Sequence, residues 1–216
     1  VAGRELSLYV SRGLNRGRTN RLGHLLAQAE IAADKSNPPL WIQGALLEKG
    51  FARVRTDGNN PEMAAQMLGL ESKARAAGLG LWARPEYAIL SPDAAEAKIG
   101  TFQIVEGTIY DIATVRSTSY LNFGKNWRED FSGGITPAAR IAFARAGLKP
   151  MEWRGRRVRL RGFVEDRNGP YIVIDSPGQI EFPDGNDPAP DTPLGTATLR
   201  PKPMYSLRHI DVSPPK

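Results

Sequence analysis

Three arginines alternate with two apolar residues in one short segment: Arg157, Val158, Arg159, Leu160 and Arg161. Successive side chains of a β-strand point to opposite faces, so this spacing places three guanidinium groups on one face. Such a row could follow a phosphate backbone. The alternative is a solvated outer face on which two nearby acids, Glu165 and Asp166, neutralise part of the charge.

Four aromatic residues follow one another between positions 120 and 131: Tyr120, Phe123, Trp127 and Phe131. Exposed aromatic rings stack on nucleobases. Tyr120 and Phe123 are three residues apart and face opposite sides of a regular strand, so one of them belongs to the core. Trp127 lies in a polar run and is the better candidate for exposure. Tyr120 and Trp127 are therefore the candidate stacking residues.

A second group of arginines lies near the start of the chain: Arg12, Arg16, Arg18 and Arg21. Gly13 and Gly17 indicate a flexible loop there. Arginines at this density could contact a phosphate backbone or an acidic partner, with Arg16 and Arg18 as the central candidates. The alternative is an ordinary solvated loop.

Few groups are suited to catalysis. The chain has no cysteine, which excludes disulfides, thiolate zinc sites and a cysteine nucleophile. Its two histidines, His24 and His209, are too far apart in sequence to suggest a local metal site. Triad, phosphate-loop and metal-ligand spacings are missing from the sequence. The residues themselves predict no catalytic group, no metal and no cofactor.

Composition favours an ordinary globular protein with a preference for polyanions. The chain has 216 residues, a net charge of +6 and a pI near 9.7. The positive excess is spread along the chain, which argues against a histone-like mechanism but leaves room for a local basic groove. No apolar run approaches the roughly 20 residues that span a bilayer, so we expect a soluble protein. A chain without cysteine suits cytoplasm and periplasm equally, so the compartment stays open.

The elements that must position these residues differ between two parts of the chain. Over residues 1–84, apolar alternation and capping signals predict two strands and two helices. The strands are expected at 6–10 and 24–31, and the helices at 40–49 and from Asn60-Pro61-Glu62 to Gly78. Met63, Met67, Trp41 and Trp82 are expected to pack inside this part.

Residues 85–99 are expected to be a linker or a short helix, and residues 100–182 are rich in strand patterns. Strands are expected at 102–115 with a bend at Gly107, and at 120–123, 131–135, 156–165 and 171–182. A helix is expected from Thr136 to Gly147, and a tight turn at Arg167-Asn168-Gly169. Three strands, a helix and two strands is the order of a five-stranded OB barrel.

The last stretch, residues 183–216, holds 8 of the 17 prolines and shows no hydrophobic periodicity. This composition predicts an extended tail that does not fold alone. A short island, Met204 to Leu207, could dock on another surface.

Three motifs within residues 3–84 resemble staphylococcal (micrococcal) nuclease-like domains. Residues 20–27, NRLGHLLA, are similar to the D-R-Y-G-R-x-L-A stretch of that family. Residues 46–54 resemble its helix and following G-x-A-x-V strand, and residues 71–82 its last helix with the Gly-x-Trp turn. Residues 102–182 resemble the OB-like domain that follows such a domain in some bacterial proteins. The resemblance implies a partial nuclease-like OB barrel with helices, followed by a second OB barrel.

The family resemblance also implies a catalytic centre that this chain departs from. Family catalysis uses a calcium ion held by aspartates, a glutamate that activates water, and two arginines that stabilise charge. The carboxylates and one arginine belong to strands that would precede Val1. His24 stands in place of the second arginine, and imidazole cannot make a bidentate phosphate clamp. We expect calcium only if an upstream segment exists. The alternative for His24 is a strand residue with a satisfied hydrogen bond.

Together these observations predict a mostly β, α+β protein with domains at 1–84 and 100–182. The leading hypothesis is a nuclease-family protein without catalytic carboxylates in this chain, which binds nucleic acid or docks on a protein. A protein partner would use the barrel edge that the missing strands leave open, and the tail. The alternatives are a structural accessory subunit of a larger assembly and a calcium-dependent phosphodiesterase whose opening strands lie upstream.

Overall fold

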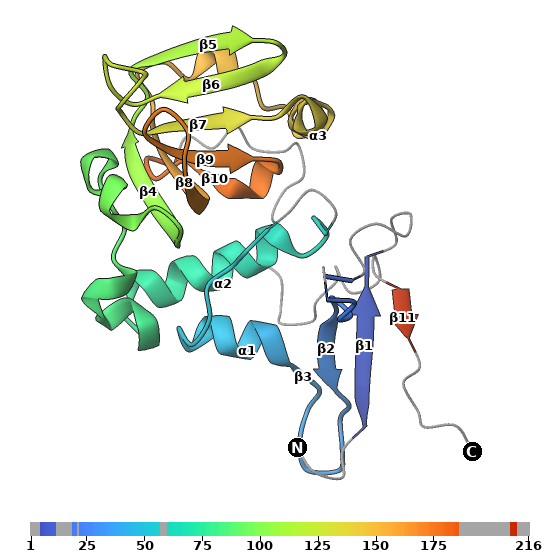
Figure 1. Cartoon of the computed structure of the whole chain (residues 1–216). Coiled ribbons are helices and arrows are strands. Elements are labelled where there is room, and N and C mark those ends of the chain that lie inside the picture. Colours follow the sequence, from blue (N-terminus) through green and yellow to red (C-terminus); the bar gives the residue numbers. More distant parts are fainter. Residues whose placement is uncertain (1–4, 12–18, 21, 57–59, 186–207, 211–216) are drawn as a thin grey trace. The chain divides into compact units, whose positions relative to one another are not determined.

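The computed structural model describes residues 5–11, 19–20, 22–56, 60–185 and 208–210. This part of the chain is α+β and consists mostly of strands with few helices (Figure 1). It divides into two compact units, described here one at a time. The described residues of unit 1 fall within 5–54, 60–85 and 208–210, and those of unit 2 within 55–56 and 86–185. None of the described helices is long and apolar enough to cross a membrane.

Unit 1 contains one antiparallel sheet and two helices. The sheet order is β11-β1-β2-β3, with β1 at Leu6–Val10, β2 at Gln28–Ile31, β3 at Leu40–Trp41 and β11 at Arg208–Ile210. The helices are α1 at Ile42–Glu48 and α2 at Ala64–Ala76, and a 3₁₀ turn, η1, follows at Gly80–Ala83. Met63 is buried against Tyr9, Trp41 and Met67, which confirms that these residues pack inside.

Three starts of elements expected in unit 1 are wrong. The helix expected from Asn60-Pro61-Glu62 begins at Ala64, with Met63 as its N-cap residue. The strand expected from His24 begins only at Gln28, because the residues before it form a turn around Asn20. The helix expected from Leu40 begins at Ile42, because Leu40 and Trp41 first pair with β2. The predicted end of the second helix at Gly78 agrees with α2, since Gly78 takes a left-handed φ of 61° directly after it.

The described residues of unit 2 form seven strands and one α-helix. The strands are β4 (Phe102–Thr108), β5 (Asp111–Val115), β6 (Thr118–Asn122), β7 (Ser132–Ile135), β8 (Arg157–Asp166), β9 (Pro170–Ile174) and β10 (Ile180–Glu181). Helix α3 spans Arg140–Arg145, between β7 and β8. The sheet order is β10-β8-β9-β7-β6-β5, and β4 also pairs with β8. Strands β7 and β9 run parallel, and the other pairs are antiparallel.

The strand expected over residues 102–115 is interrupted, and not at Gly107. The break falls at Ile109 and Tyr110, whose backbone N–H groups donate to Arg156 O and Asn122 O respectively. Gly107 stays within β4, where an added Cβ would lie 2.6 Å from Pro92 Cγ. This glycine therefore permits close packing, whereas Ile109 and Tyr110 change pairing partners.

The other differences in unit 2 lie at element ends. The strand expected over 171–182 ends at Ile174, because Ser176 and Pro177 start a capped 3₁₀ turn, η7 (Pro177–Gln179). The helix expected from Thr136 opens with a 3₁₀ turn, η5 (Pro137–Ala139), before α3. The stretch expected as a linker contains three short 3₁₀ turns: η2 (Pro85–Tyr87), η3 (Pro92–Ala94) and η4 (Glu96–Lys98).

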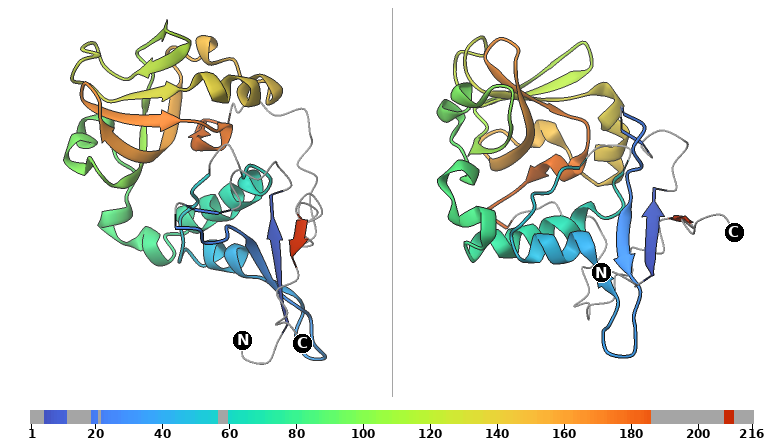
Figure 2. Two further views of the ribbon diagram at one scale, coloured as in Figure 1. Left: turned by 45° about the vertical axis from the view of Figure 1, so that its right-hand side comes forward. Right: turned by 60° about the horizontal axis from the view of Figure 1, so that its bottom comes forward.

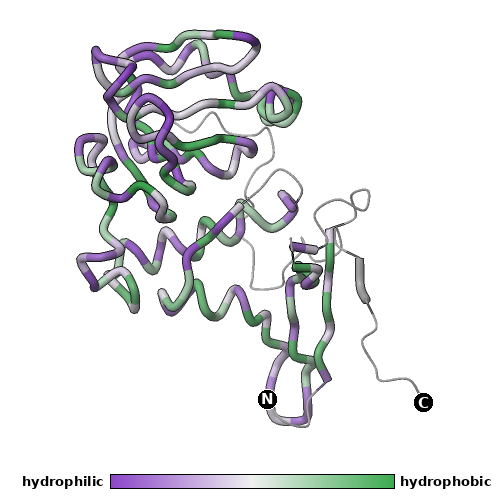
Figure 3. The backbone as a smooth tube through the Cα atoms, viewed as in Figure 1, coloured by the Kyte–Doolittle hydropathy of each residue, from purple (hydrophilic) through white to green (hydrophobic). Residues whose placement is uncertain are grey.

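A contiguous apolar core lies between the curved strands of unit 2 (Figure 2). It includes six fully buried residues from five strands: Val105, Leu121, Ile135, Leu160, Val164 and Ile172. Trp153, in the turn before β8, packs its ring 5.1 Å from that of Phe182. Figure 3 shows hydrophobic and hydrophilic residues interspersed along the strands of unit 2; in β8, single-residue alternation turns Val158 and Leu160 inward.

Candidate nucleic-acid interface

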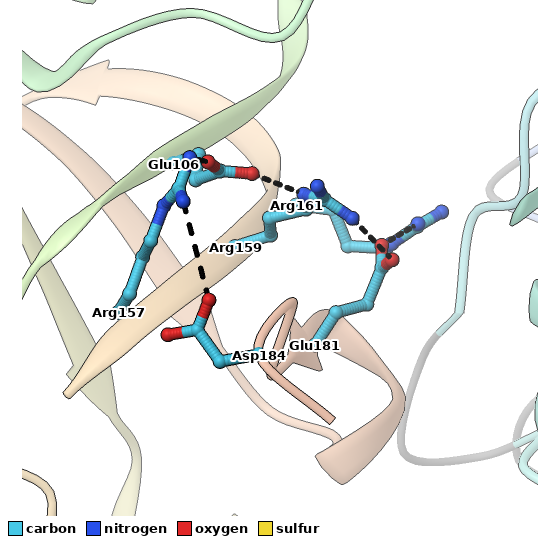
Figure 4. Close-up of polar contacts among 6 residues, drawn as sticks. All are labelled: Glu106, Arg157, Arg159, Arg161, Glu181 and Asp184. Carbon is cyan, nitrogen blue, oxygen red and sulfur yellow. Dashed lines mark hydrogen bonds and ion pairs between the residues drawn. The ribbon is translucent and has the colours of Figure 1, made fainter. Parts of the chain in front are cut away.

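The three arginines of β8 do lie in one row, but they face acids from neighbouring strands (Figure 4). The ion pairs are Arg157–Glu106, Arg159–Glu106, Arg159–Glu181, Arg161–Glu181 and, at 4.0 Å, Arg157–Asp184. Glu106 comes from β4 and Glu181 from β10, the two strands that flank β8. Cations and carboxylates therefore alternate across this surface.

Burial differs strongly along the row. Arg161 is 1% exposed, the side chain of Arg159 is 22% exposed, and that of Arg157 is 55% exposed. The acids that face them are not Glu165 and Asp166, as expected from the sequence: Glu165 instead pairs with Arg167 at 2.8 Å. A buried cation requires a partner, which Glu181 supplies to Arg161. Only Arg157 presents much of its side chain to solvent.

A second surface lies on the outward side of β6, β7 and β9. Tyr120 of β6 is paired with Gly134 of β7, and its ring centroid is 6.3 Å from that of Tyr171 on β9. A Cβ added to Gly134 would overlap the Tyr171 hydroxyl, so the Tyr171 side chain lies across this glycine. The next residue, Leu121, is fully buried in the core, so Tyr120 points outward. Tyr171 is covered and supports the ring of Tyr120, which is half-buried.

The hydroxyl group of Tyr171 on this aromatic surface is uncharged, and a cation lies beside its ring. Burial raises the pKa of the Tyr171 hydroxyl above its usual 10.0; Tyr120 and Glu165 add to this, and Arg167 opposes it. The Arg167 guanidinium lies 5.3 Å from the centroid of the Tyr171 ring. Tyr171 therefore stays protonated at neutral pH, and Arg167 brings a cation to the rim of the surface.

Trp127 lies in the loop between β6 and β7 and is 54% exposed, as its polar surroundings predict. Asn126 organises this loop: its backbone N–H donates to Asp130 Oδ2 at 2.7 Å, and its side-chain amide donates to Glu129 Oε2 at 2.8 Å. The guanidinium of Arg128 lies 4.9 Å from the Trp127 ring centroid. The loop thus presents an aromatic ring and a cation together.

The turn between β8 and β9 lies against this loop. Asn168 and Gly169 both have positive φ, 54° and 87°, which confirms the predicted tight turn. A Cβ on Gly169 would overlap the backbone of Glu129. Glycine is therefore required here by both backbone conformation and contact. The close fit fixes the Trp127 loop beside Arg167.

The candidate residues of unit 1 are only partly described. His24 is exposed and lies outside the strands, where its backbone N–H donates to Asn20 Oδ1 at 2.9 Å. The alternative of a strand histidine is therefore wrong in its placement. Arg16 and Arg18, with Arg12 and Arg21, lie outside the described residues, so their expected contacts stay a prediction.

The sequence analysis missed Tyr171, Arg167 and Gly134 as parts of this surface. The Asn168-Gly169 turn does place Arg167 and Tyr171 at the start of β9. The parallel pairing of β7 with β9 sets Tyr171 opposite Ser132, two residues before Gly134, and the Tyr171 side chain reaches across to Gly134. No local pattern indicates which strands pair in parallel. The consecutive glycines Gly133-Gly134 were the available signal for a close approach within a strand.

Within the described ranges, no three His, Cys, Asp or Glu side chains lie close enough together to hold a metal ion.

Comparison with known proteins assigns the first part of the chain to a class. A family model described as staphylococcal nuclease homologue matches residues 12–84. These residues form a staphylococcal nuclease-like domain, and they include the three motifs on which the resemblance was based. A search of curated proteins finds no match. The matched range ends before residues 86–185 of unit 2, for which the OB resemblance remains a prediction.

Proposed function

We propose that this nuclease-related chain binds single-stranded nucleic acid through unit 2, in which β4 to β9 form an OB barrel. The strand order supports the barrel: β4 and β5 follow each other in the chain, β5 pairs with β6, and β4 pairs with β8. When β4 and β5 are counted as one bent strand, the elements from β4 to β9 make five strands, with helix α3 between the third and the fourth. In OB barrels the second and third strands carry the ligand face, and here these are β6 and β7.

The observation that carries the proposal is the position of Tyr120 on that face. Its ring lies beside that of Tyr171, next to β7, where Gly134 has no side chain to occupy the surface. Trp127 stands at the end of the same pair of strands, with Arg128 against it. Aromatic rings in sequence-tolerant binding sites stack on bases, while nearby cations attract the backbone.

The role of the β8 arginines is smaller in this proposal than their spacing suggests. Arg157 supplies a phosphate contact from its exposed side chain, while Arg159 and Arg161 hold β4, β8 and β10 together through Glu106 and Glu181. The overall positive charge adds a general attraction for polyanions. Binding should therefore weaken as salt is added, with a shallow slope that reflects few phosphate contacts.

The test is fluorescence anisotropy of a labelled single-stranded oligonucleotide of about 16 nucleotides, with wild type, Tyr120→Ala and Trp127→Ala. Each substitution should weaken binding about 5- to 100-fold, the effect of losing a stacked base. Phe163→Ala is the matched control, because this exposed aromatic lies on β8 opposite Phe102. Equal affinity of wild type and Tyr120→Ala would refute the site.

We further propose that the nuclease-like domain acts without catalysis of its own. His24 supports this, because an imidazole occupies the position where the family resemblance implies a phosphate-clamping arginine. Incubation with single- and double-stranded DNA, with calcium or with a chelator, should yield no cleavage. Cleavage that requires calcium would favour the alternative, a calcium-dependent phosphodiesterase.

A second candidate function is that of an accessory subunit that docks on a protein. The observation that favours it is the short pairing of β1 with the C-terminal strand β11, which covers three residues of β1 on that edge. An accessory subunit should co-purify with a fixed partner and show no salt-dependent affinity for nucleic acid.

A further inference from the structure

Strand β1 of unit 1 has a different kind of neighbour on each edge (Figure 1). On one edge it pairs with β2 over Leu6 to Tyr9. On the other it pairs with β11, in the register Leu8–Ile210, Tyr9–His209 and Val10–Arg208. From the sequence we expected an open barrel edge that an upstream segment or a partner would cover. On β1 the chain's own C-terminal segment partly fills an edge.

The pairing of β11 is short. It covers three residues of β1 and leaves Leu6 and Ser7 without a partner on that edge among the described residues. Leu6 is 39% exposed. Short edge strands contribute few backbone hydrogen bonds, and an unpaired edge is a template for another strand. β11 therefore pairs with only part of this edge of β1.

The segment that reaches this edge is connected to unit 2 through residues 186–207, of which five are proline. Antiparallel pairing uses backbone groups, so the same segment from a second copy would form the same bonds in the same register. Exchange of identical elements between copies is a low-cost route to a dimer. Within one chain, a tethered segment has an effective concentration in the millimolar range, so exchange should appear mainly at high protein concentration.

We propose that the β1 edge is an acceptor site for an extended strand and that two copies of this chain exchange the segment Arg208–Ile210 across it. The site lies in the nuclease-related unit and does not depend on nucleic-acid binding by unit 2. Strand addition at an exposed sheet edge is an established mode of recognition, with affinity from main-chain bonds.

The absence of cysteine allows a direct test by disulfide trapping. Opposite residues of an antiparallel pair have Cα atoms about 4.5–5.5 Å apart, within the range that a disulfide spans. The double variant Leu8→Cys/Ile210→Cys should therefore form a cross-link within one chain at micromolar concentration. Equal mixtures of the single variants Leu8→Cys and Ile210→Cys can form that cross-link only between copies, and its yield should rise severalfold as concentration increases toward millimolar.

The matched control replaces Ile210→Cys by His209→Cys, whose partner in the backbone register is Tyr9 and not Leu8. It should cross-link much less with Leu8→Cys in both formats. A double variant that cross-links only within the chain, with no mixed dimer at any concentration, would overturn the exchange. Failure of both formats would overturn the pairing itself.

A second measurement avoids substitutions. Sedimentation of the wild-type chain over the same concentrations should show a dimer fraction, and removal of residues 208–216 should lower it. Removal of residues 211–216 alone should leave it unchanged. A wild-type chain that stays monomeric throughout would also contradict the proposal.

Discussion

Two surfaces of unit 2 carry the residues that suggested nucleic-acid binding, and the structure treats them differently. On the β8 surface three arginines meet Glu106, Glu181 and Asp184, so the formal charges of this group cancel. On the outward side of β6, β7 and β9, aromatic rings lie over a glycine, and Arg167 stands at the rim. The first surface holds strands together through ion pairs, whereas the second presents aromatic side chains.

The difference shows that the spacing of charged residues along a strand predicts which face they share. It does not predict which residues of other strands form ion pairs with them. The acids opposite the β8 arginines come from positions 106, 181 and 184, far away in sequence. An arginine row with carboxylates from adjacent strands is a cross-strand ion-pair network. The following predictions separate the two surfaces, beginning with the largest effect.

Arg161→Met should lower the free energy of unfolding by about 3 kcal/mol, because it removes the buried partner of Glu181. Urea denaturation followed by circular dichroism measures this loss. The double variant Arg161→Met/Glu181→Met removes both charges and should recover much of the stability. A single variant as stable as wild type would show that the network does not hold β8 and β10 together.

Gly134→Ala should cost about 1–3 kcal/mol of stability and abolish most oligonucleotide binding, because the new methyl group displaces Tyr171. Gly133→Ala is the control on the neighbouring residue. Its Cβ would point inward, 2.5 Å from Leu160 Cδ1, so it should lower stability but leave the affinity of the folded protein nearly unchanged. Denaturation and anisotropy on both variants test this; equal losses of affinity would contradict the assigned face.

Tyr171→Phe should flatten the alkaline limb of the stability profile. Because the pKa of folded Tyr171 is raised above 10.0, its contribution is fully present below pH 10 and is lost as pH rises toward the folded value. The phenylalanine variant lacks this ionisation. Unfolding free energies between pH 8 and about 11 should fall less steeply for the variant; parallel slopes would show that burial does not perturb this hydroxyl.

Arg157→Gln should have the smallest effect. Its side chain is 55% exposed, and its partner Glu106 keeps the ion pair with Arg159, so stability should change by less than about 0.5 kcal/mol. Loss of one phosphate contact should lower the slope of log affinity against log salt by about 0.7 for a single strand. A much larger loss of affinity would move the interface from the aromatic surface to the β8 surface.

Several features were readable from the sequence because their causes are local. The Asn168-Gly169 turn follows from two residues that tolerate positive φ. Strand, strand, strand, helix, strand, strand is the order observed from β4 to β9, once β4 and β5 are counted together, and the short strand β10 follows. Exposure of Trp127 followed from its polar neighbours. Each of these depends on a few consecutive residues.

The features that sequence reasoning missed depend on pairing between distant segments. Burial of Arg161 requires Glu181 on β10, and the expected strand 171–182 hid the turn at Ser176 that creates β10. The break after Thr108 occurs where the backbone changes partners, which Gly107 did not mark. The β1–β11 pairing joins the two ends of the chain. Long-range pairing leaves no periodic signal in a single sequence.

The most direct measurement is an NMR titration of isotope-labelled full-length chain with a single-stranded oligonucleotide. Shifts in backbone amide signals should concentrate at residues 118–122, 126–128, 132–134 and 167–173, the outward surface of β6, β7 and β9 with its two turns. Shifts confined to residues 102–108 and 157–161 would place binding on the β8 surface and contradict the account. The absence of any shift at saturating oligonucleotide would refute nucleic-acid binding by unit 2.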